Sequence, residues 1–333
     1  MTTVLLVGAG AVGARAARQL IDTPGLDRLL VTARAGERAR ELAAALGTRA
    51  ASVPLDGDLP GELDAVAIAI PGRASARLAG QAVAVAVPVA AVADDEEGLA
   101  GLLALDERAR KAGVLVAAGC GLVPGLSEVL ARHAANGLDE ADEAHIARVG
   151  AAGPDCVAAL RKARRDRPRE WHDGAWLTPR RLGSQLVWFP EPIGARECEV
   201  VAPGVELLRD ALPEVRHASV RYGEPPVRSA SQALVTRRAI DDGWGGARVE
   251  VWGWKGRARQ AIVYGVIERP AVAAGTVLAV TAARLAGLLP HVTLRTQTGG
   301  VRSLGAAVDP APFLAELARR GVKAAAFEGV SSG

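Results

Sequence analysis

Apolar runs and amphipathic stretches alternate along the first 120 residues of the chain. The runs are short and apolar throughout, which is typical of strands buried on both faces of a parallel sheet. The stretches between them read as helices with few helix-breaking residues. We expect strands at 3–7, 29–33, 65–70, 87–92 and 114–118, and helices at 11–20, 37–46, 75–83 and 99–111. This alternation predicts an α/β domain with a doubly wound parallel sheet.

A second pattern runs from about residue 140 to residue 270, where short segments alternate apolar and polar positions with a period of two. Trp252 and Trp254 should share one face of such a segment, with Val251 on the opposite face. Lys255-Gly256 favours a hairpin to the next segment. We expect strands at 185–189, 197–201, 219–222, 232–235, 248–254 and 260–267. The pattern predicts an antiparallel sheet with one face toward solvent or a ligand.

The tail of the chain is again helical in pattern. A helix is expected over 274–288 and another over 313–320. Asp309-Pro310 suits the N-cap and first position of the second helix, and Gly321 suits its end. An edge strand is expected over 322–327.

A glycine-rich turn joins the first expected strand to the first expected helix. Gly8-Ala9-Gly10-Ala11-Val12-Gly13 fits the pattern G-x-G-x-x-G in a strand–turn–helix context. Gly8 permits the tight turn, Gly10 lets a pyrophosphate approach the backbone, and Gly13 lets the helix pack close to the strand. The helix N-terminus presents unpaired N–H groups to the phosphates. The context predicts a Rossmann dinucleotide-binding domain, and the alternative is an ordinary glycine-rich turn.

The end of the second expected strand bears on the choice between NAD(H) and NADP(H). NAD-binding domains usually carry an Asp or Glu there, but this strand ends Val31-Thr32-Ala33-Arg34. Arg34 can meet a 2′-phosphate with two parallel charge-assisted hydrogen bonds, Thr32 can add a hydroxyl, and Arg38 follows one helical turn later. We therefore predict NADP(H) in preference to NAD(H). The alternative is that Arg34 and Arg38 are solvated surface side chains.

Composition excludes several classes of protein. Half of the 333 residues are hydrophobic, so the chain has enough apolar material for a folded core. A net charge of +3 suits an anionic ligand but is too small to indicate nucleic acid, and the basic run Arg161–Arg169 reads as an exposed face. The longest apolar run, 82–93, is too short for a bilayer. The three cysteines form no close-spaced pair, which favours the reducing cytoplasm: they are Cys120, Cys156 and Cys198.

Three further segments complete a pattern that resembles the saccharopine dehydrogenase (saccharopine reductase-like) family. They are Leu105–Val114, the Gly119–Ser127 segment with its G-x-G-x-x-P-G order, and Phe189-Pro190-Glu191-Pro192-Ile193-Gly194. With the opening turn and the tail, the resemblance covers nearly the whole chain. It implies a Rossmann domain, an inserted α+β domain and a C-terminal return to the first domain. It also implies NAD(P)-linked chemistry at a carbon–nitrogen bond, with the Gly119–Ser127 segment beside the nicotinamide.

The chain departs from the family pattern at one position. The family carries an aspartate after the fourth strand, whereas residues 89–93 are wholly apolar before Asp94. An acid role for that aspartate is therefore not carried over to this chain.

These arguments give a set of candidate site residues. Those expected at the cofactor are Gly8, Gly10, Ala11, Val12, Gly13, Thr32, Arg34, Arg38, Ile70, Pro71, Gly119 and Pro124. The catalytic candidates are Cys120, near the expected nicotinamide, and His133, about two turns into the following helix; a structural or surface role is the alternative for both. The substrate candidates are Trp171, Arg181, Trp252 and Trp254. No H-x-x-x-H or C-x-x-C motif is present, so we expect no metal site.

We expect three parts: a Rossmann domain over 1–135, an α+β substrate or dimerisation domain over 136–272, and a C-terminal segment over 273–333. The predicted function is that of an NADP-dependent oxidoreductase acting on the C=N or C–N bond of an amino-acid-derived imine or secondary amine. A C=C or C=O reductase of specialised metabolism and a non-catalytic dinucleotide-binding protein are the alternatives. The expected partner is a small-molecule substrate, with neither nucleic acid nor membrane, and a homodimer is the default assembly.

Overall fold

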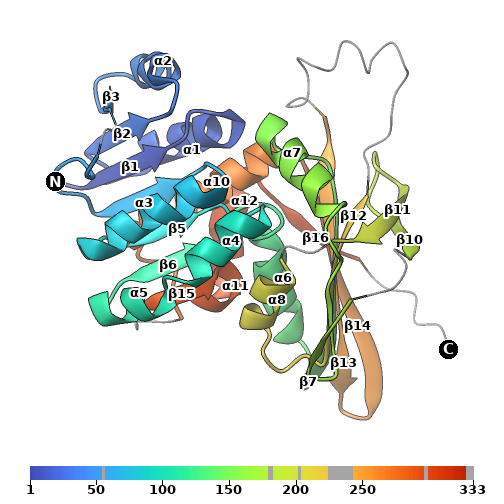
Figure 1. The fold of residues 1–333 in the computed structure, drawn as a ribbon. Helices are drawn as coiled ribbons and strands as arrows, with labels where there is room; N and C mark the ends of the chain where they lie inside the picture. The colour runs from blue at the N-terminus through green and yellow to red at the C-terminus, as the bar shows by residue number, and fades with distance from the viewer. Residues whose placement is uncertain (55–56, 179–182, 202–203, 224–242, 296–298, 328–333) are drawn as a thin grey trace, which may run out of the picture.

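Two sheets stand side by side with helices packed between them (Figure 1). This computed structural model describes residues 1–54, 57–178, 183–201, 204–223, 243–295 and 299–327. The chain builds most of the first sheet before it enters the second, and it then returns to complete both. The predicted combination of a doubly wound domain with a second α/β region is confirmed.

The first sheet has seven strands, all parallel, in the order β15-β6-β5-β4-β1-β2-β3. Their bounds are β1 Thr3–Val7, β2 Arg28–Thr32, β3 Ala50–Ser52, β4 Ala65–Ile68, β5 Val89–Ala91, β6 Leu115–Ala118 and β15 Gly300–Ser303. The strand order reverses between β1 and β4, because the chain winds outward in opposite directions from these two central strands. Ligands of doubly wound sheets bind outside the carboxyl ends of the strands at such a reversal.

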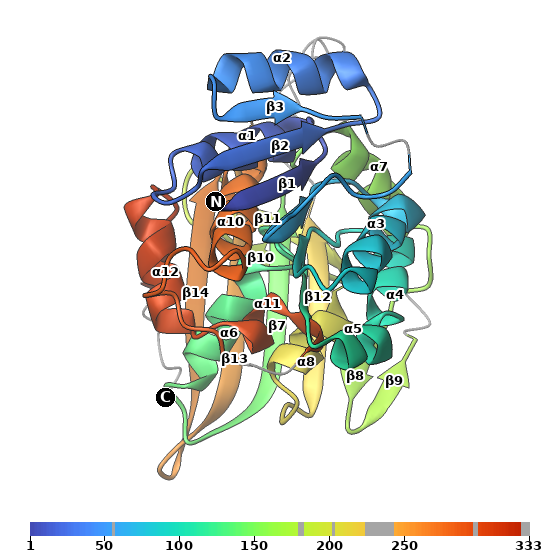
Figure 2. The same ribbon diagram turned by 90° about the vertical axis from the view of Figure 1, so that its left-hand side faces the viewer.

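Helices cover both faces of the first sheet (Figure 2). On one side lie α1 (Ala11–Ile21) and α10 (Pro270–Leu285), and on the other lie α3 (Gly72–Ala84), α4 (Glu96–Leu103) and α5 (Asp106–Ala112). The helix expected over 99–111 is two helices, α4 and α5, because the chain turns at residues 104–105 before Asp106 begins the second. The helix α2 (Gly36–Leu46) packs beside β2 and β3. Within the described residues, no helix has the length and apolar character needed to cross a membrane.

The second sheet is mixed, and not wholly antiparallel as the sequence pattern predicted. Its order is β10-β11-β12-β7-β13-β14-β16, with the hairpin β8–β9 attached to β12. The bounds are β7 Glu140–Val149, β8 Glu170–His172, β9 Ala175–Leu177, β10 Ser184–Trp188, β11 Ala195–Val200, β12 His217–Gly223, β13 Gly245–Lys255, β14 Ala258–Glu268 and β16 Ala324–Phe327. The pair β7–β12 is parallel because the intervening chain crosses over instead of forming a hairpin. The expected strand 232–235 lies outside the described residues.

The hairpin predicted at Lys255-Gly256 is present, with Lys255 paired to Ala258 across a two-residue loop. The inner face of the second sheet packs on α6 (Leu126–Ala135) and on α8 (Val205–Ala211), while α7 (Pro154–Ala163) lies near the amino end of α1. The outer face points away from the first sheet. This difference between the two faces decides which side chains of the second sheet can reach a ligand of the first.

The tail contributes to both sheets. After α10 the chain adds β15 beside β6, then α11 (Leu304–Ala307) and α12 (Pro310–Arg319), and it ends with β16 beside β14. Asp309 caps α12 as expected, because its Oδ1 accepts a hydrogen bond from the backbone N–H of Ala311 at 3.2 Å. The edge strand expected over 322–327 is also confirmed. The exact domain boundaries stay a prediction.

Candidate functional site

The glycine-rich turn lies at the carboxyl end of β1, next to the end of β4, where the strand order reverses. Gly8 has a φ of +110°, and a Cβ there would lie 2.7 Å from the carbonyl oxygen of Ala69. A Cβ on Gly13 would lie 1.8 Å from the carbonyl oxygen of Gly8. Both positions therefore exclude a side chain, as the fingerprint predicts.

Gly10 differs from its two partners because the space beside it is open. A Cβ on Gly10 would meet no atom within 4 Å, and its φ of −82° suits any residue. Gly10 is also the N-cap of α1, where no side chain caps the helix and no acidic residue occupies the first turn. The first N–H groups, among them those of Ala11 and Val12, thus form a helix terminus that favours an anion.

The end of β2 lies beside this turn, since Gly8 N–H donates to the carbonyl oxygen of Thr32 at 2.8 Å. Thr32 is buried, whereas Arg34 and Arg38 are exposed. Neither arginine side chain has a hydrogen bond or ion pair with any residue that the structure describes. Two unpaired cations therefore stand where a dinucleotide of the usual orientation places its adenine ribose.

Asp95 connects the loops that follow β4 and β5. Its Oδ2 accepts a hydrogen bond from the backbone N–H of Gly72, and its Oδ1 accepts one from that of Gly98, both at 2.8 Å. The same carboxylate therefore caps α4 and fixes the backbone just after Ile70-Pro71. Sequence reasoning missed this link, although an Asp three residues before a helical Gly is a recognisable N-cap signal.

The loop between β6 and α6 is buried from Gly119 to Gly125. Its backbone is tied to β5, because Cys120 N–H donates to the carbonyl oxygen of Ala91 at 2.9 Å. A Cβ on Gly125 would lie 2.3 Å from the carbonyl oxygens of Gly119 and Gly121, so only glycine fits there. The predicted cofactor positions Gly119 and Pro124 thus belong to a compact loop that occupies a fixed place beside the ends of β5 and β6.

Glu128 fastens the same loop to α6. Its carboxylate accepts hydrogen bonds from the backbone N–H of Gly125 and, at 2.7 Å, from the hydroxyl of Ser127. The side chain is almost fully buried, and this burial raises the pKa of Glu128 above its ordinary value.

Arg148 of β7 brings the second sheet into contact with this loop. The guanidinium, only 6% exposed, donates from Nη1 to the carbonyl oxygen of Val123 and from Nη2 to that of Gly150 at 3.4 Å. Nη2 also lies 3.4 Å from the sulfur of Cys156. Burial, and after it the nearby Asp94 carboxylate, raise the pKa of the Cys156 thiol to about 11. Arg148 and Asp94 thus both lie near this thiol and have opposite effects on its pKa.

Sequence reasoning did not identify Arg148, because its role depends on a contact between two sheets. The available signal is one arginine on the apolar inner face of a strand, in line with Ala144 and Ile146. A buried arginine needs partners, so this pattern alone predicts a contact beyond the strand itself.

The two catalytic candidates lie where the sequence placed them, Cys120 in the loop after β6 and His133 on α6. Cys120 is fully buried, and this burial raises the pKa of its thiol to about 12, so it is an unreactive side chain at neutral pH. His133 lies two turns into α6 against the ring of Tyr264, with 5.4 Å between ring centroids. It borders an apolar cavity of about 330 Å³ shared with Leu130 and Leu317. We assign no catalytic role to either residue.

The tryptophans proposed as substrate residues do not lie on one common surface. Trp252 and Trp254 lie on the outer face of β13 with Val251 buried opposite, as the alternation predicts. Trp171 is instead on β8, where its ring packs edge-on against Trp176. The guanidinium carbon of Arg209 lies 3.3 Å from the centroid of the Trp171 ring. Arg181 lies outside the described residues.

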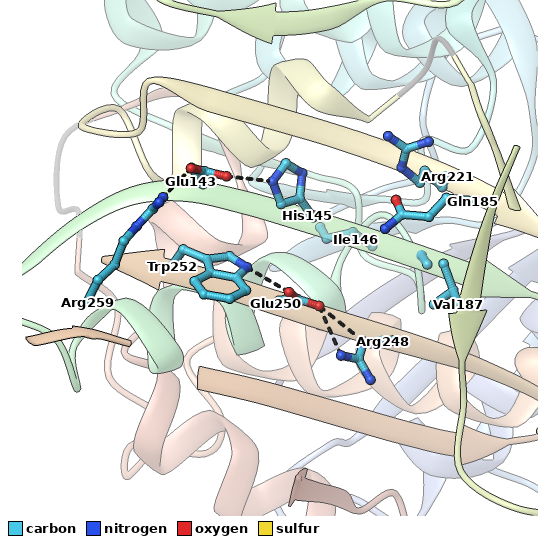
Figure 3. Close-up of a pocket in the computed structure, with 11 residues that line it drawn as sticks. Glu143, His145, Ile146, Gln185, Val187, Arg221, Arg248, Glu250, Trp252 and Arg259 are labelled. Carbon is cyan, nitrogen blue, oxygen red and sulfur yellow. Dashed lines mark hydrogen bonds and ion pairs between the residues drawn. The ribbon is translucent and has the colours of Figure 1, made fainter. Parts of the chain in front are cut away.

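Trp252 borders a cavity of about 350 Å³ on the outer face of the second sheet (Figure 3). Four of the charged groups around this cavity pair with one another, whereas Arg221 pairs with Glu170 outside it. Glu250 accepts a hydrogen bond from Trp252 Nε1 at 2.6 Å and pairs with Arg248 at 3.0 Å, while Arg259 pairs with Glu143. Because Arg148 reaches the first domain from the opposite face of the sheet, this cavity is separate from the glycine-rich turn.

The basic run predicted to be an exposed face is partly neutralised. Arg164 pairs with Glu199 at 2.9 Å, and Arg169 bridges Glu96 and Glu206 at 3.3 and 2.8 Å. Arg161, like Arg165 and Arg167, is exposed as expected.

Comparison with known proteins agrees with this architecture. The model of the shikimate/quinate 5-dehydrogenase family matches residues 1–84, which include the glycine-rich turn. Saccharopine dehydrogenase (L-Glu forming) from Saccharomyces cerevisiae superposes with a TM-score of 0.70 over 98% of this chain and 100% of that chain, at 14% identity. The chain has the fold of saccharopine dehydrogenase.

Two further solved structures are similar at lower TM-scores. GenD2 from gentamicin A biosynthesis, in complex with NAD, is 14% identical over 98% of this chain and 97% of that chain, with a TM-score of 0.49. The DAP dehydrogenase of C. glutamicum, in complex with DAP, is 15% identical over 96% and 99%, also with a TM-score of 0.49. No curated protein sequence matches the chain significantly. The shared fold confirms the resemblance to saccharopine dehydrogenase that the sequence indicated.

Proposed function

We propose that this protein is an NADP-dependent oxidoreductase. The observation that carries the proposal is the glycine-rich turn at the β1–β4 reversal, where Gly10 leaves open space beside an uncapped helix terminus. The turn and the first N–H groups of α1 would hold the pyrophosphate. Nicotinamide cofactors supply or accept a hydride, so the chain itself must bind, orient and shield the reactants.

The preference for NADP(H) rests on Arg34. No carboxylate follows β2 until Glu37, while Arg34 and Arg38 are exposed and unpaired among the described residues. Arginine binds phosphate with two parallel hydrogen bonds, and a 2′-phosphate would supply the missing partner. Loss of NADPH selectivity in Arg34→Ala is the direct test.

The reaction we propose is reduction of a C=N bond in an amino-acid-derived imine, or the reverse oxidation of a secondary amine. Two observations support this reaction: the fold shared with saccharopine dehydrogenase, and the buried Gly119–Gly125 loop, which the family resemblance places beside the nicotinamide. An iminium ion carries its own proton, so such a reduction needs no dedicated general acid. Arg148 would act as a positioning residue, because it holds the Val123 carbonyl of that loop.

The experiment is a substrate screen that follows NADPH consumption. Purified protein is given NADPH with a panel of 2-oxo acids plus amino acids, cyclic imines, enones and simple ketones. Gly10→Val serves as the matched cofactor-site variant, since a Cβ at this position meets no other atom and the added side chain enters the open space beside the turn. Turnover with the imine-forming pairs, absent in Gly10→Val, is the expected result.

The same screen separates the alternatives. Turnover confined to enones or ketones would identify a C=C or C=O reductase and overturn the C=N assignment. NADPH binding without turnover on any member would favour a non-catalytic dinucleotide-binding protein. A cytoplasmic location and a homodimer stay predictions; all three cysteines are free and buried, as that location requires.

A further inference from the structure

Two histidines and an aspartate meet at the β8–β9 hairpin, far from the glycine-rich turn. Antiparallel pairing of β8 with β12 sets His172 directly opposite His217. Asp173 follows in the two-residue turn Asp173-Gly174, where φ values of +46° and +83° fit a tight hairpin of type I′. One ligand atom from each of the three side chains lies within 4.8 Å of the other two. In Figure 2 this hairpin is at the lower right, whereas β1 and β2 are near the top.

The spacing of the three groups matches the coordination sphere of a small transition-metal ion. Asp173 Oδ2 lies 3.3 Å from His172 Nδ1 and 3.5 Å from His217 Nε2. Ligands bound tetrahedrally at about 2.1 Å from zinc are about 3.4 Å from one another. Two imidazole nitrogens with one carboxylate oxygen favour ions of the zinc type over Mg²⁺ or Ca²⁺, which prefer oxygen ligands throughout.

The groups around the cluster prepare His217 and Asp173 to act as ligands. Among the described residues, His217 Nε2 is buried and makes no hydrogen bond, and Asp173 Oδ2 faces it at 3.5 Å. Glu143 Oε1 lies 3.8 Å from the other ring nitrogen, Nδ1, so an ion bound at Nε2 would leave the Nδ1 proton facing a carboxylate.

Asp173 is held by Arg216, which donates to its Oδ1 at 2.5 Å and leaves Oδ2 toward the two histidines. Residues that hydrogen-bond to the ligands and orient them in this way are typical of metal sites.

We propose that His172, Asp173 and His217 bind one divalent transition-metal ion of the zinc type, with water in the remaining position. The ring of His172 stacks on that of His217 with 3.9 Å between centroids, and it is half-exposed, so it has room to turn toward the ion. The ion would fasten the β8–β9 hairpin to β12. The site is independent of the proposed oxidoreductase function, and it escaped the sequence motifs because 45 residues separate its two histidines.

The test is metal binding to tag-free protein that has been treated with a chelator. Co²⁺ binding is followed by its visible absorption, and Zn²⁺ binding by calorimetry, with Mg²⁺ as the negative control. We expect one ion per chain, and an affinity at least about tenfold lower in His172→Asn and in His217→Asn. His133→Asn is the matched control, because His133 lies on α6 against the ring of Tyr264 and is not part of the cluster, and it should bind as the wild type does.

A second readout guards against unfolding of the variants. Zn²⁺ should raise the Tm of the wild type and of His133→Asn, because an ion that binds the folded chain stabilises it. His172→Asn should keep the metal-free Tm, since its side chain is half-exposed, and should lose the rise. Equal affinity in all variants, or no ion bound by the wild type, would overturn the proposal.

Discussion

The carboxyl edge of the first sheet and the outer face of the second sheet both carry arginines, but the two regions use them differently. At the first edge, Arg34 and Arg38 are exposed and have no partner among the residues the structure describes. On the outer face, Arg248 and Arg259 each have a carboxylate partner. Ion-paired side chains stabilise the surface that carries them. Charged side chains without a partner, beside an uncapped helix N-terminus, are instead available to a ligand.

The same comparison extends to polar groups inside the molecule. Glu316 on α12 is nearly buried and accepts hydrogen bonds from Arg320 at 2.7 Å and Arg319 at 2.9 Å, with His291 Nε2 at 3.0 Å. Arg320 in turn donates to the backbone of Gln19, which ties α12 to α1. This cluster of paired charges stabilises the fold. Its contribution to the free energy of unfolding can be compared with the effect of removing the unpaired Arg34.

The largest expected effect comes from a change in the glycine-rich turn. Gly13→Ala would place a methyl group 1.8 Å from the carbonyl oxygen of Gly8. We expect it to lower the free energy of unfolding by more than about 4 kcal/mol and to abolish NADPH binding, as measured by urea unfolding and calorimetry. Gly10→Ala is the control: it should leave stability within about 0.5 kcal/mol of the wild type while weakening NADPH binding. Equal effects of the two changes would contradict the assigned roles.

The paired carboxylate Glu316 comes next. Burial alone would raise the pKa of Glu316, but hydrogen bonds from Arg320, Arg319 and His291 outweigh it and lower that pKa from 4.5 to about 2. A lowered pKa stabilises the folded state above pH 4.5, and this stabilisation fades as the pH falls toward 2. Glu316→Gln should therefore cost about 2 to 3 kcal/mol at pH 7 and progressively less below pH 4.5, measured by urea unfolding across pH. Glu41→Gln, at an exposed position on α2 with no partner among the described residues, is the control variant. A cost for Glu316→Gln that is constant with pH would exclude this explanation.

Arg34→Ala tests the proposed contact between the carboxyl edge of the first sheet and a 2′-phosphate. Hydrogen bonds to charged groups contribute about 1.5 to 3 kcal/mol, so NADPH affinity should fall roughly ten- to hundredfold while NADH affinity stays unchanged. Arg40, which is exposed like Arg34 but lies on α2, provides the control. Arg40→Ala should change neither the NADPH affinity nor the NADH affinity. Unchanged stability in both variants would show that the loss lies in binding. A parallel fall in NADPH and NADH affinity would remove the case for a 2′-phosphate contact.

The smallest effect is expected on the outer face. Arg259 is 43% exposed, and its pairs with Glu143 and Asp142 are open to solvent. Arg259→Ala should lower the free energy of unfolding by less than about 1 kcal/mol and leave NADPH affinity unchanged. A clear loss of NADPH affinity would mean that this face takes part in the dinucleotide site, and the contrast between the two regions would fail.

Most strands and helices of the first domain were predictable to within a few residues because their signals are local. The strand Thr3–Val7 and the turn that follows it are encoded by neighbouring residues, and the structure reproduces both. The short strand Ala50–Ser52 was missed because three small residues carry no periodic pattern. The parallel pairing of β7 with β12 was missed because it depends on a crossover rather than on either strand's own sequence.

The candidate site residues also divide into those with a local sequence signal and those that depend on contacts between distant segments. The glycines and Arg34, which we propose bind the dinucleotide, could be found in the sequence because dinucleotide-binding motifs have a fixed spacing. Arg148 and the His172–His217 pair depend on contacts between distant segments, so their residue types alone do not distinguish them from surface side chains. Cys120 illustrates the opposite case: its place in the chain attracts attention, yet burial makes its thiol unreactive.

The central claim is that the carboxyl edge of the first sheet binds NADP(H) through the glycine-rich turn and Arg34. The most direct test is calorimetric titration of the wild-type protein with NADPH and with NADH under the same conditions. Tight binding of NADPH to one site per chain, with NADH at least about tenfold weaker, is the predicted result. Tighter binding of NADH would contradict the role of Arg34, and binding of neither would contradict the dinucleotide site itself.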